Sequence, residues 1–230
     1  MQSTICAAKS SFDPEAAVMY IPEAFRIDDV HALQALVSAY PLGTLITSGT
    51  GGLQASPLPF LLKPDVGPHG TLLAHMALAN PQLDALRAGG ESLVLFYGPQ
   101  SYVSPSWYPA KRRHGKVVPT WNYAVVQVRG RVRLIEDAGR LREHVVALAA
   151  EHEARRNPPW SPDDAPPDFL AQLLQAIAGI EIAIDTIEGK FKLTQNRNPE
   201  DREAVVAALA SDDDPHRNPT LAAWMRKFGT

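Results

Sequence analysis

The residues best suited to binding a ligand are concentrated in residues 105–123, PSWYPAKRRHGKVVPTWNY. This stretch holds two of the chain's four Trp, two of its six Tyr and four Lys or Arg residues. Aromatic faces can stack on a planar ring, and hydroxyl, amide and cationic groups can bind its polar edge or a phosphate. The stretch therefore predicts contact with a planar, anionic ligand. The alternative is a loop that covers one end of the fold with its own rings and leaves its cations in water.

Two further segments carry groups that could bind an anion. In GKFKLTQNR (189–197), Lys190 and Lys192 lie on the same side of a predicted strand because side chains alternate with a period of two. Two like charges on one face repel each other unless an anion or water lies between them. In HMALANPQ (75–82), His75 ends a strand, and Asn80 with the following proline opens a helix whose free N–H groups could bind phosphate. A lone histidine such as His75 is also a common core residue.

The elements around these segments predict a mainly β protein with added helices, of the α+β class. The sequence contains antiparallel hairpin signals and no regular βαβ alternation, which favours a small β-barrel or sandwich. A helix is expected over 28–40, with Asp28 as its N-cap, and a bulge at Gly130 in a strand over 121–136. Residues 98–119 show no hydrophobic period and are expected to form one long loop. The expected strands are 43–48, 53–63, 71–78, 92–98, 121–136 and 180–195, and the expected later helices are 141–152, 169–178 and 198–209.

Composition limits the classes of protein to consider. The chain has 230 residues, a net charge of −3 and one cysteine, Cys6, so it can form no intramolecular disulfide, which fits a cytoplasmic location. No apolar run reaches the roughly 20 residues that cross a bilayer, and the N-terminus lacks the pattern of a signal peptide. Residues 1–18 are expected to be a disordered extension, or to precede the true start at Met19. Residues 19–210 are expected to form one domain, and 211–230 a tail that is mobile or docks as a short helix.

Five motifs, taken together and in order, resemble the PaiB family, also called FMN-binding negative transcriptional regulators. They are YIPEAF, HMALANPQ, GPQSYVSPSWYP, GKVVPTWNYAVV and GIEIAIDTIEGKFKLTQNRNPEDR, and they cover about residues 19 to 210. The resemblance implies a split β-barrel like that of pyridoxamine-phosphate-oxidase-type flavoproteins. It also implies a homodimer with FMN in a groove at the subunit interface.

The family motifs nominate a set of cofactor-binding positions and no catalytic or metal-binding residue. The loop is more basic than the family pattern at Arg112 and Arg113, whose role is left open. The nominated residues are His75, Asn80, Ser104, Trp107, Tyr108, Thr120, Trp121, Asn122, Lys190, Lys192, Gln195 and Asn196.

Three functions fit these observations. The first is an FMN-binding transcriptional regulator or flavin-dependent sensor, although the sequence contains no helix-turn-helix and its pI near 6.2 does not favour DNA binding. The second is an FMN-dependent oxidoreductase acting on a small molecule, with the flavin carrying the electrons. The third is a haem-binding split barrel, with His75 or His114 as the axial ligand.

Overall fold

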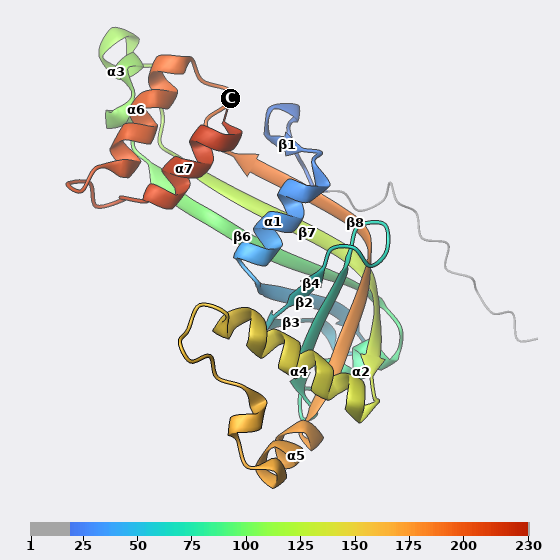
Figure 1. The fold of residues 1–230 in the computed structure, drawn as a ribbon. Coiled ribbons are helices and arrows are strands. Elements are labelled where there is room, and N and C mark those ends of the chain that lie inside the picture. The colour runs from blue at the N-terminus through green and yellow to red at the C-terminus, as the bar shows by residue number, and fades with distance from the viewer. Residues whose placement is uncertain (1–18, 230) are drawn as a thin grey trace, which may run out of the picture.

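The computed structural model describes residues 19–229 and shows one large antiparallel sheet with helices packed against it (Figure 1). The expected extension, residues 1–18, lies outside the described residues. The strands are β1 (Arg26–Ile27), β2 (Leu42–Gly49), β3 (Gly52–Pro59), β4 (Leu61–Lys63), β5 (Thr71–Ala77), β6 (Glu91–Val103), β7 (Thr120–Ile135) and β8 (Ile177–Lys192). The α-helices are α1 (Val30–Ala39), α2 (Gln82–Arg87), α3 (Pro109–His114), α4 (Ala138–Glu153), α5 (Pro167–Gln175), α6 (Pro199–Ala210) and α7 (Pro219–Phe228).

The sheet curls into a barrel that is left open along one seam. Its strands follow the order β3-β2-β6-β7-β8-β5-β4, with antiparallel neighbours, and β1 pairs with β8. Strands β3 and β5 approach each other without forming a ladder between described residues. Asn80, just after β5, instead donates a hydrogen bond from Nδ2 to Ser56 Oγ of β3 at 3.1 Å. This arrangement confirms the expected split β-barrel with added helices.

A bulge at Gly130 lets the long strands β7 and β8 bend around the barrel. Arg129 pairs with Thr186 and Gly130 with Ile184, which leaves Asp185 as the extra residue of β8. A Cβ on Gly130 would collide with the carbonyl oxygen of Ala183, so only glycine fits this close approach. The predicted bulge is confirmed.

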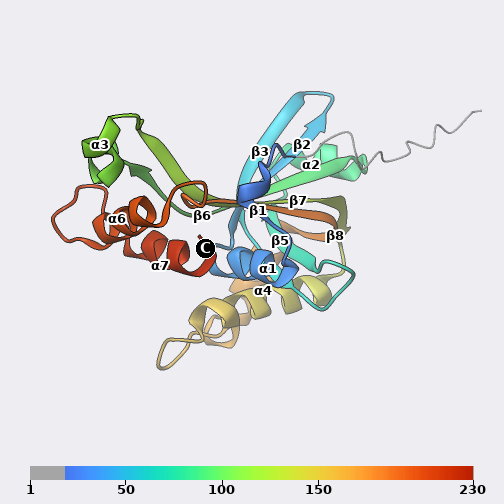
Figure 2. The same ribbon diagram turned by 90° about the horizontal axis from the view of Figure 1, so that it is seen from above.

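Alternation along the strands separates an inner face from an outer face. The inner face carries the core, with Leu45, Val94 and Val126 fully buried. Helix α1 packs directly on this face. Its Leu36 lies so close to Gly98 of β6 that a Cβ on Gly98 would be 3.0 Å from Leu36 Cδ1. Figure 2 shows α1, α6 and α7 on the same side of the long strands.

The outer face of β2 and β6 is partly accessible to solvent. It is defined here by Thr44, Ile46, Leu93, Leu95 and Tyr97, which alternate with the inward-facing residues; Thr44 pairs with Leu95 and Ile46 with Leu93 across the two strands. Tyr97 is 56% exposed, and the other four side chains are only partly buried.

The C-terminal segment adds helix α7 to the core. Asn218 accepts a hydrogen bond from the Leu221 amide at 2.9 Å and so caps the helix. Leu221 is fully buried, and the Trp224 ring lies 5.3 Å from that of Phe191 in β8. The division of the chain into an expected domain and tail stays a prediction, but the helix in the tail belongs to the same hydrophobic cluster as the barrel.

Three local predictions are wrong. The expected loop over 98–119 is much shorter, because β6 continues to Val103 and α3 forms at 109–114. Pro99 cannot donate to a ladder, but a register shift between Tyr97 and Gln100 accommodates it as a bulge. The N-cap of α1 is Asp29 rather than Asp28, and α2 begins at Gln82 rather than at the proline before it.

None of the helices within residues 19–229 is both long and apolar enough to cross a membrane.

Leu221→Ala should lower the free energy of unfolding by about 2–5 kcal/mol, the usual cost of truncating a fully buried leucine. Urea denaturation monitored by tryptophan fluorescence would measure this loss. Thr220→Ala, at the exposed neighbouring position, serves as the matched control and should change stability by less than about 0.5 kcal/mol. Equal stabilities for Leu221→Ala and Thr220→Ala would show that α7 is not part of the cooperative core.

Candidate functional site

Two lysines near the end of β8 form the centre of the candidate site. Lys190 and Lys192 lie opposite Val125 and Tyr123 in the β7–β8 ladder and therefore project from the same face. Lys190 Nζ donates a hydrogen bond to the Tyr20 carbonyl at 3.1 Å. It also lies 5.4 Å from the ring centroid of Tyr20 and 5.8 Å from that of Tyr123, which are cation–π distances.

Lys192 is the more deeply placed of the two cations. Its ammonium donates a hydrogen bond to Thr120 Oγ1. Partial burial lowers the pKa of Lys192, and the positive charge of Lys190 lowers it further. Both effects disfavour the charged amine, whereas an anion held between the two lysines would favour it.

Aromatic side chains continue this face along β6 and β7. Tyr102 and Trp121 are opposite each other in the ladder, with ring centroids 6.5 Å apart in an edge-on arrangement. Trp121 is 51% exposed, so its ring is accessible for stacking. Together these residues form what is called here the lysine–aromatic patch: Tyr102, Thr120, Trp121, Tyr123, Lys190 and Lys192.

Four residues of this neighbourhood were not nominated from the sequence, and one of them is Tyr102, opposite Trp121. Tyr123 and Tyr20 flank Lys190, and Arg26 of β1 lies directly opposite Lys190 in its ladder. Tyr123 could have been found, since it alternates with Trp121 along a predicted strand. The positions of Tyr20 and Arg26 beside Lys190 depend on the pairing of β1 with β8. A strand of only two residues leaves no pattern in the sequence from which this pairing could be predicted.

Two nominated residues, Tyr108 and Asn122, point into the protein instead. Tyr108 is 2% exposed, burial raises its pKa, and the Arg197 guanidinium lies 5.1 Å from its ring. Asn122 is fully buried and donates from Nδ2 to Thr194 Oγ1 at 2.6 Å. These contacts connect β7 and the segment after β6 to the chain that follows β8.

Four other nominated residues form hydrogen bonds outside the lysine–aromatic patch or are exposed to solvent. Ser104 Oγ accepts from the Ser106 amide at 3.2 Å and caps a 3-10 turn over Pro105–Trp107. Trp107 Nε1 donates to Asp214 Oδ2 at 2.8 Å, which ties this turn to the C-terminal segment. Gln195 closes the turn after β8 by bonding its own neighbours, with Oε1 accepting from the Leu193 amide at 2.6 Å. Asn196 is exposed.

His75 and Asn80 lie away from the lysine–aromatic patch. His75 is opposite Gly179, which precedes Lys190 by eleven residues on β8, or roughly 35 Å of strand. His75 Nδ1 lies 3.1 Å from Nε2 of His144 on α4. Asn80 Oδ1 accepts from the Gln82 amide at 2.9 Å, so one of the N–H groups expected to bind phosphate is already engaged. Within one subunit, the structure does not bring these two residues to the lysines.

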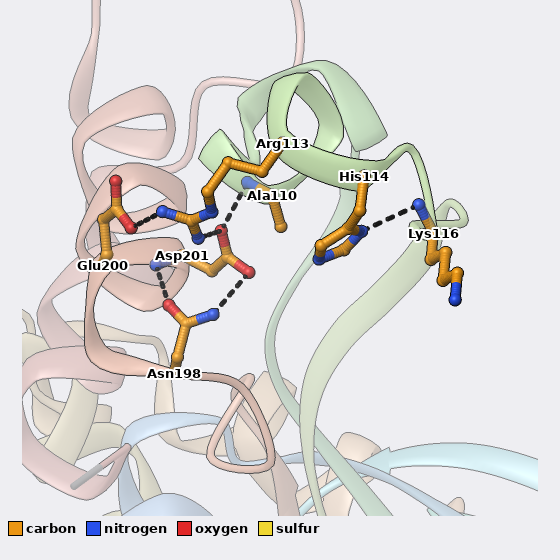
Figure 3. A network of polar contacts seen from close by, with 7 residues as sticks. All are labelled: Ala110, Arg113, His114, Lys116, Asn198, Glu200 and Asp201. Carbon is orange, nitrogen blue, oxygen red and sulfur yellow. Dashed lines mark hydrogen bonds and ion pairs between the residues drawn. The ribbon is translucent and has the colours of Figure 1, made fainter.

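The basic run KRRHGK, residues 111–116, covers the end of helix α3 and the two residues after it. Arg113 of this run contacts residues of α6 (Figure 3). Arg113 forms an ion pair with Glu200 and lies 3.9 Å from the buried carboxylate of Asp201. Asp201 also accepts from the Ala110 amide at 3.1 Å and from Asn198 Nδ2 at 3.0 Å. The network fixes α3 to the start of α6.

The remaining cations of this run face solvent. Arg112 is exposed, as are Lys111 and Lys116, and such charges are favourable near a helix C-terminus. His114, a candidate haem ligand, is also exposed, and its Nδ1 accepts from the Lys116 amide at 3.0 Å.

Comparisons with known proteins agree with this fold and support FMN as the cofactor. The family model described as "Putative FMN-binding domain" matches residues 19–186. The Bacillus subtilis "Protease synthase and sporulation protein PAI 2" is 32% identical over 200 residues, covering 86% of this chain and 92% of the relative.

Two solved structures share the fold at low sequence identity. The FAD and heme binding protein from Mycobacterium smegmatis has a TM-score of 0.54 at 20% identity, covering 73% of each chain. The flavocytochrome Anf3 from Azotobacter vinelandii also has a TM-score of 0.54, at 17% identity, covering 73% of this chain and 69% of that one.

Stability should fall in mild acid because of the His75–His144 pair. Burial lowers the pKa of His144 to about 4, and the charges of His75 and Lys63 act in the same direction; burial also lowers the pKa of His75. The unfolded chain, with a His pKa of about 6.5, therefore takes up protons first as the pH falls. The free energy of unfolding should have its highest value above about pH 6.5. It should decrease by about 3 kcal/mol at most as the pH approaches about 4.

Urea denaturation at a series of pH values would measure this slope. The His144→Gln protein should lose most of this dependence of stability on pH. The His31→Gln protein, which lacks an exposed histidine, should keep it. The same slope in both variants would show that the buried pair does not control the acid response.

Proposed function

Because the chain belongs to the FMN-binding domain family and is an FMN-binding protein of the PaiB type, we propose that its lysine–aromatic patch holds the cofactor. In this proposal Lys190 and Lys192 bind the phosphate, and Trp121 with Tyr102 provides faces and edges for the ring system. The observation that carries the proposal is the placement of two lysines on one face beside exposed aromatic rings.

The chemistry of these side chains fits FMN. A phosphate carries negative charge and several acceptor oxygens, and each lysine ammonium offers three N–H donors. Lys192 is partly buried next to Lys190, and the negative charge of a bound anion would act against the burial and repulsion that lower its pKa. Trp121 presents a large, half-exposed ring that loses apolar contact with water when a flavin stacks on it.

The bound flavin would supply electron transfer, while the chain supplies its position and electrostatic surroundings. We favour a regulatory or sensing role for this flavoprotein over the oxidation or reduction of a small molecule. The name of the Bacillus subtilis relative, which refers to protease synthesis and sporulation, supports a regulatory role. A cytoplasmic location stays a prediction from the single cysteine.

A homodimer is part of the proposal. The open outer face of β2 and β6 carries Ile46, Leu93, Leu95 and Tyr97, and a second copy of the chain would remove this apolar surface from water. Tyr97 pairs with Val125 of β7, and Val125 in turn pairs with Lys190 of β8. The apolar face therefore adjoins the lysine–aromatic patch, and a partner seated there would add a wall to the cofactor site.

Replacing both Lys190 and Lys192 with alanine should weaken FMN binding at least about 30-fold, because charge-assisted hydrogen bonds worth ~2 kcal/mol or more are lost. Riboflavin, which lacks the phosphate, should bind the variant as it binds the unaltered protein. Quenching of flavin fluorescence would give both dissociation constants.

A matched control removes two exposed lysines elsewhere, Lys111 and Lys116, and should leave both affinities within twofold. If the Lys190 and Lys192 changes weaken FMN and riboflavin equally, the two lysines do not bind the phosphate.

Leu95→Lys should convert the dimer to a monomer, since it places a charge in the centre of the apolar outer face. Sedimentation velocity would measure this change, and FMN affinity should fall with dimer content. Leu173→Lys on α5, where the native side chain is 49% exposed, is the control and should leave the dimer intact. A Leu95→Lys protein that sediments like the unaltered dimer would exclude this face as the interface.

A further inference from the structure

A short N-terminal segment lies against the lysine–aromatic patch and contacts its central cation. This segment, called here the N-terminal lip, comprises residues 19–22. The Met19 amide donates to Glu188 Oε2 at 3.3 Å, and the Tyr20 carbonyl accepts from Lys190 Nζ at 3.1 Å. Ile21 is 8% exposed, so the lip is anchored in the fold immediately after these contacts.

The lip places the Lys190 ammonium close to two aromatic rings. Its Nζ atom is 5.4 Å from the Tyr20 ring centroid and 5.8 Å from that of Tyr123. Tyr20 is 82% exposed, so burial of its own ring does not explain its position. The ring and the carbonyl of Tyr20 both contact Lys190, which lies far from Tyr20 along the sequence.

These contacts restrain a side chain that is otherwise flexible. A lysine carries about 2 kcal/mol of rotamer entropy, and a ligand that orders it must offset that cost. An ammonium has three N–H donors, and the bond to the Tyr20 carbonyl is its one hydrogen bond to a described residue. Donors therefore remain for an anion while the cation is already positioned.

We propose that Tyr20 is a positioning residue of the phosphate site, because it holds Lys190 in the geometry that receives the anion. This inference rests on the proposed function, in which Lys190 binds the phosphate of FMN. The charged neighbours on this face are Lys192, Arg26 and Glu188. The Glu188 carboxylate is already engaged by the Met19 amide and, at 3.5 Å, by Gln127 Nε2.

The test compares three substitutions at one position, all of which keep the backbone carbonyl. Tyr20→Ala should weaken FMN binding about two- to five-fold, the factor that corresponds to one exposed cation–π contact. Tyr20→Leu, which keeps apolar bulk without a π face, should weaken it equally. Tyr20→Phe should match the unaltered protein, and riboflavin affinity should be unchanged in all three. Lys190→Ala is measured in parallel with both flavins.

The outcomes separate this inference from the proposed function. If Lys190→Ala lowers affinity for FMN selectively but Tyr20→Ala leaves it unchanged, the role of Tyr20 is wrong and the phosphate site stands. Equal losses of FMN and riboflavin in Tyr20→Ala would also overturn the role, because they would reflect ring contact or folding. If Lys190→Ala has no selective effect, both proposals are wrong.

Discussion

Two ammonium groups that share one face of a strand are the constraint on which the account of this protein depends. The strand repeat places the Cα atoms of Lys190 and Lys192 about 7 Å apart, and two unit charges at that separation repel by roughly 0.6–2.4 kcal/mol for effective dielectric constants between 80 and 20. The structure offsets part of this cost for Lys190 with the carbonyl and ring of Tyr20 and with the ring of Tyr123. Lys192 bears the remainder, since burial and its neighbour both lower its pKa. A bound phosphate would remove the repulsion that the protein alone cannot remove.

Contacts on the inner side of the sheet fix the strand that carries the aromatic residues of this face. Asn122, between Trp121 and Tyr123 on β7, points inward and bonds Thr194 beyond the end of β8. Helix α7 packs on the same inner side, where Met225 Sδ lies 3.5 Å from Asn122 Nδ2. The side chains of the proposed cofactor site therefore alternate with anchoring side chains along one strand. A cofactor site built on such a ladder is more precisely placed than one built on a loop.

Sequence reasoning could identify the parts of this structure that depend on local periodicity. The alternation over residues 180–192 predicted the shared face of the two lysines, and Gly130 predicted the bulge. Local pattern could not assign the direction of Tyr108 or Asn122, because their partners, Arg197 and Thr194, lie far along the chain.

The same limit applies to the long loop and to the N-terminal lip. The expected strand ended at residue 98 because no hydrophobic period follows it, but the strand continues through a bulge that depends on its pairing with β7. Tyr20 reaches Lys190 only because the two-residue strand β1 joins β8, and so short a strand leaves no periodic signal.

A crystal structure of the protein with FMN bound would test the central claim most directly. The account predicts phosphate oxygens within about 3 Å of the Nζ atoms of Lys190 and Lys192, the flavin ring against Trp121, and a second subunit on the outer face of β6. A phosphate bound elsewhere, with no contact to either lysine, would contradict it.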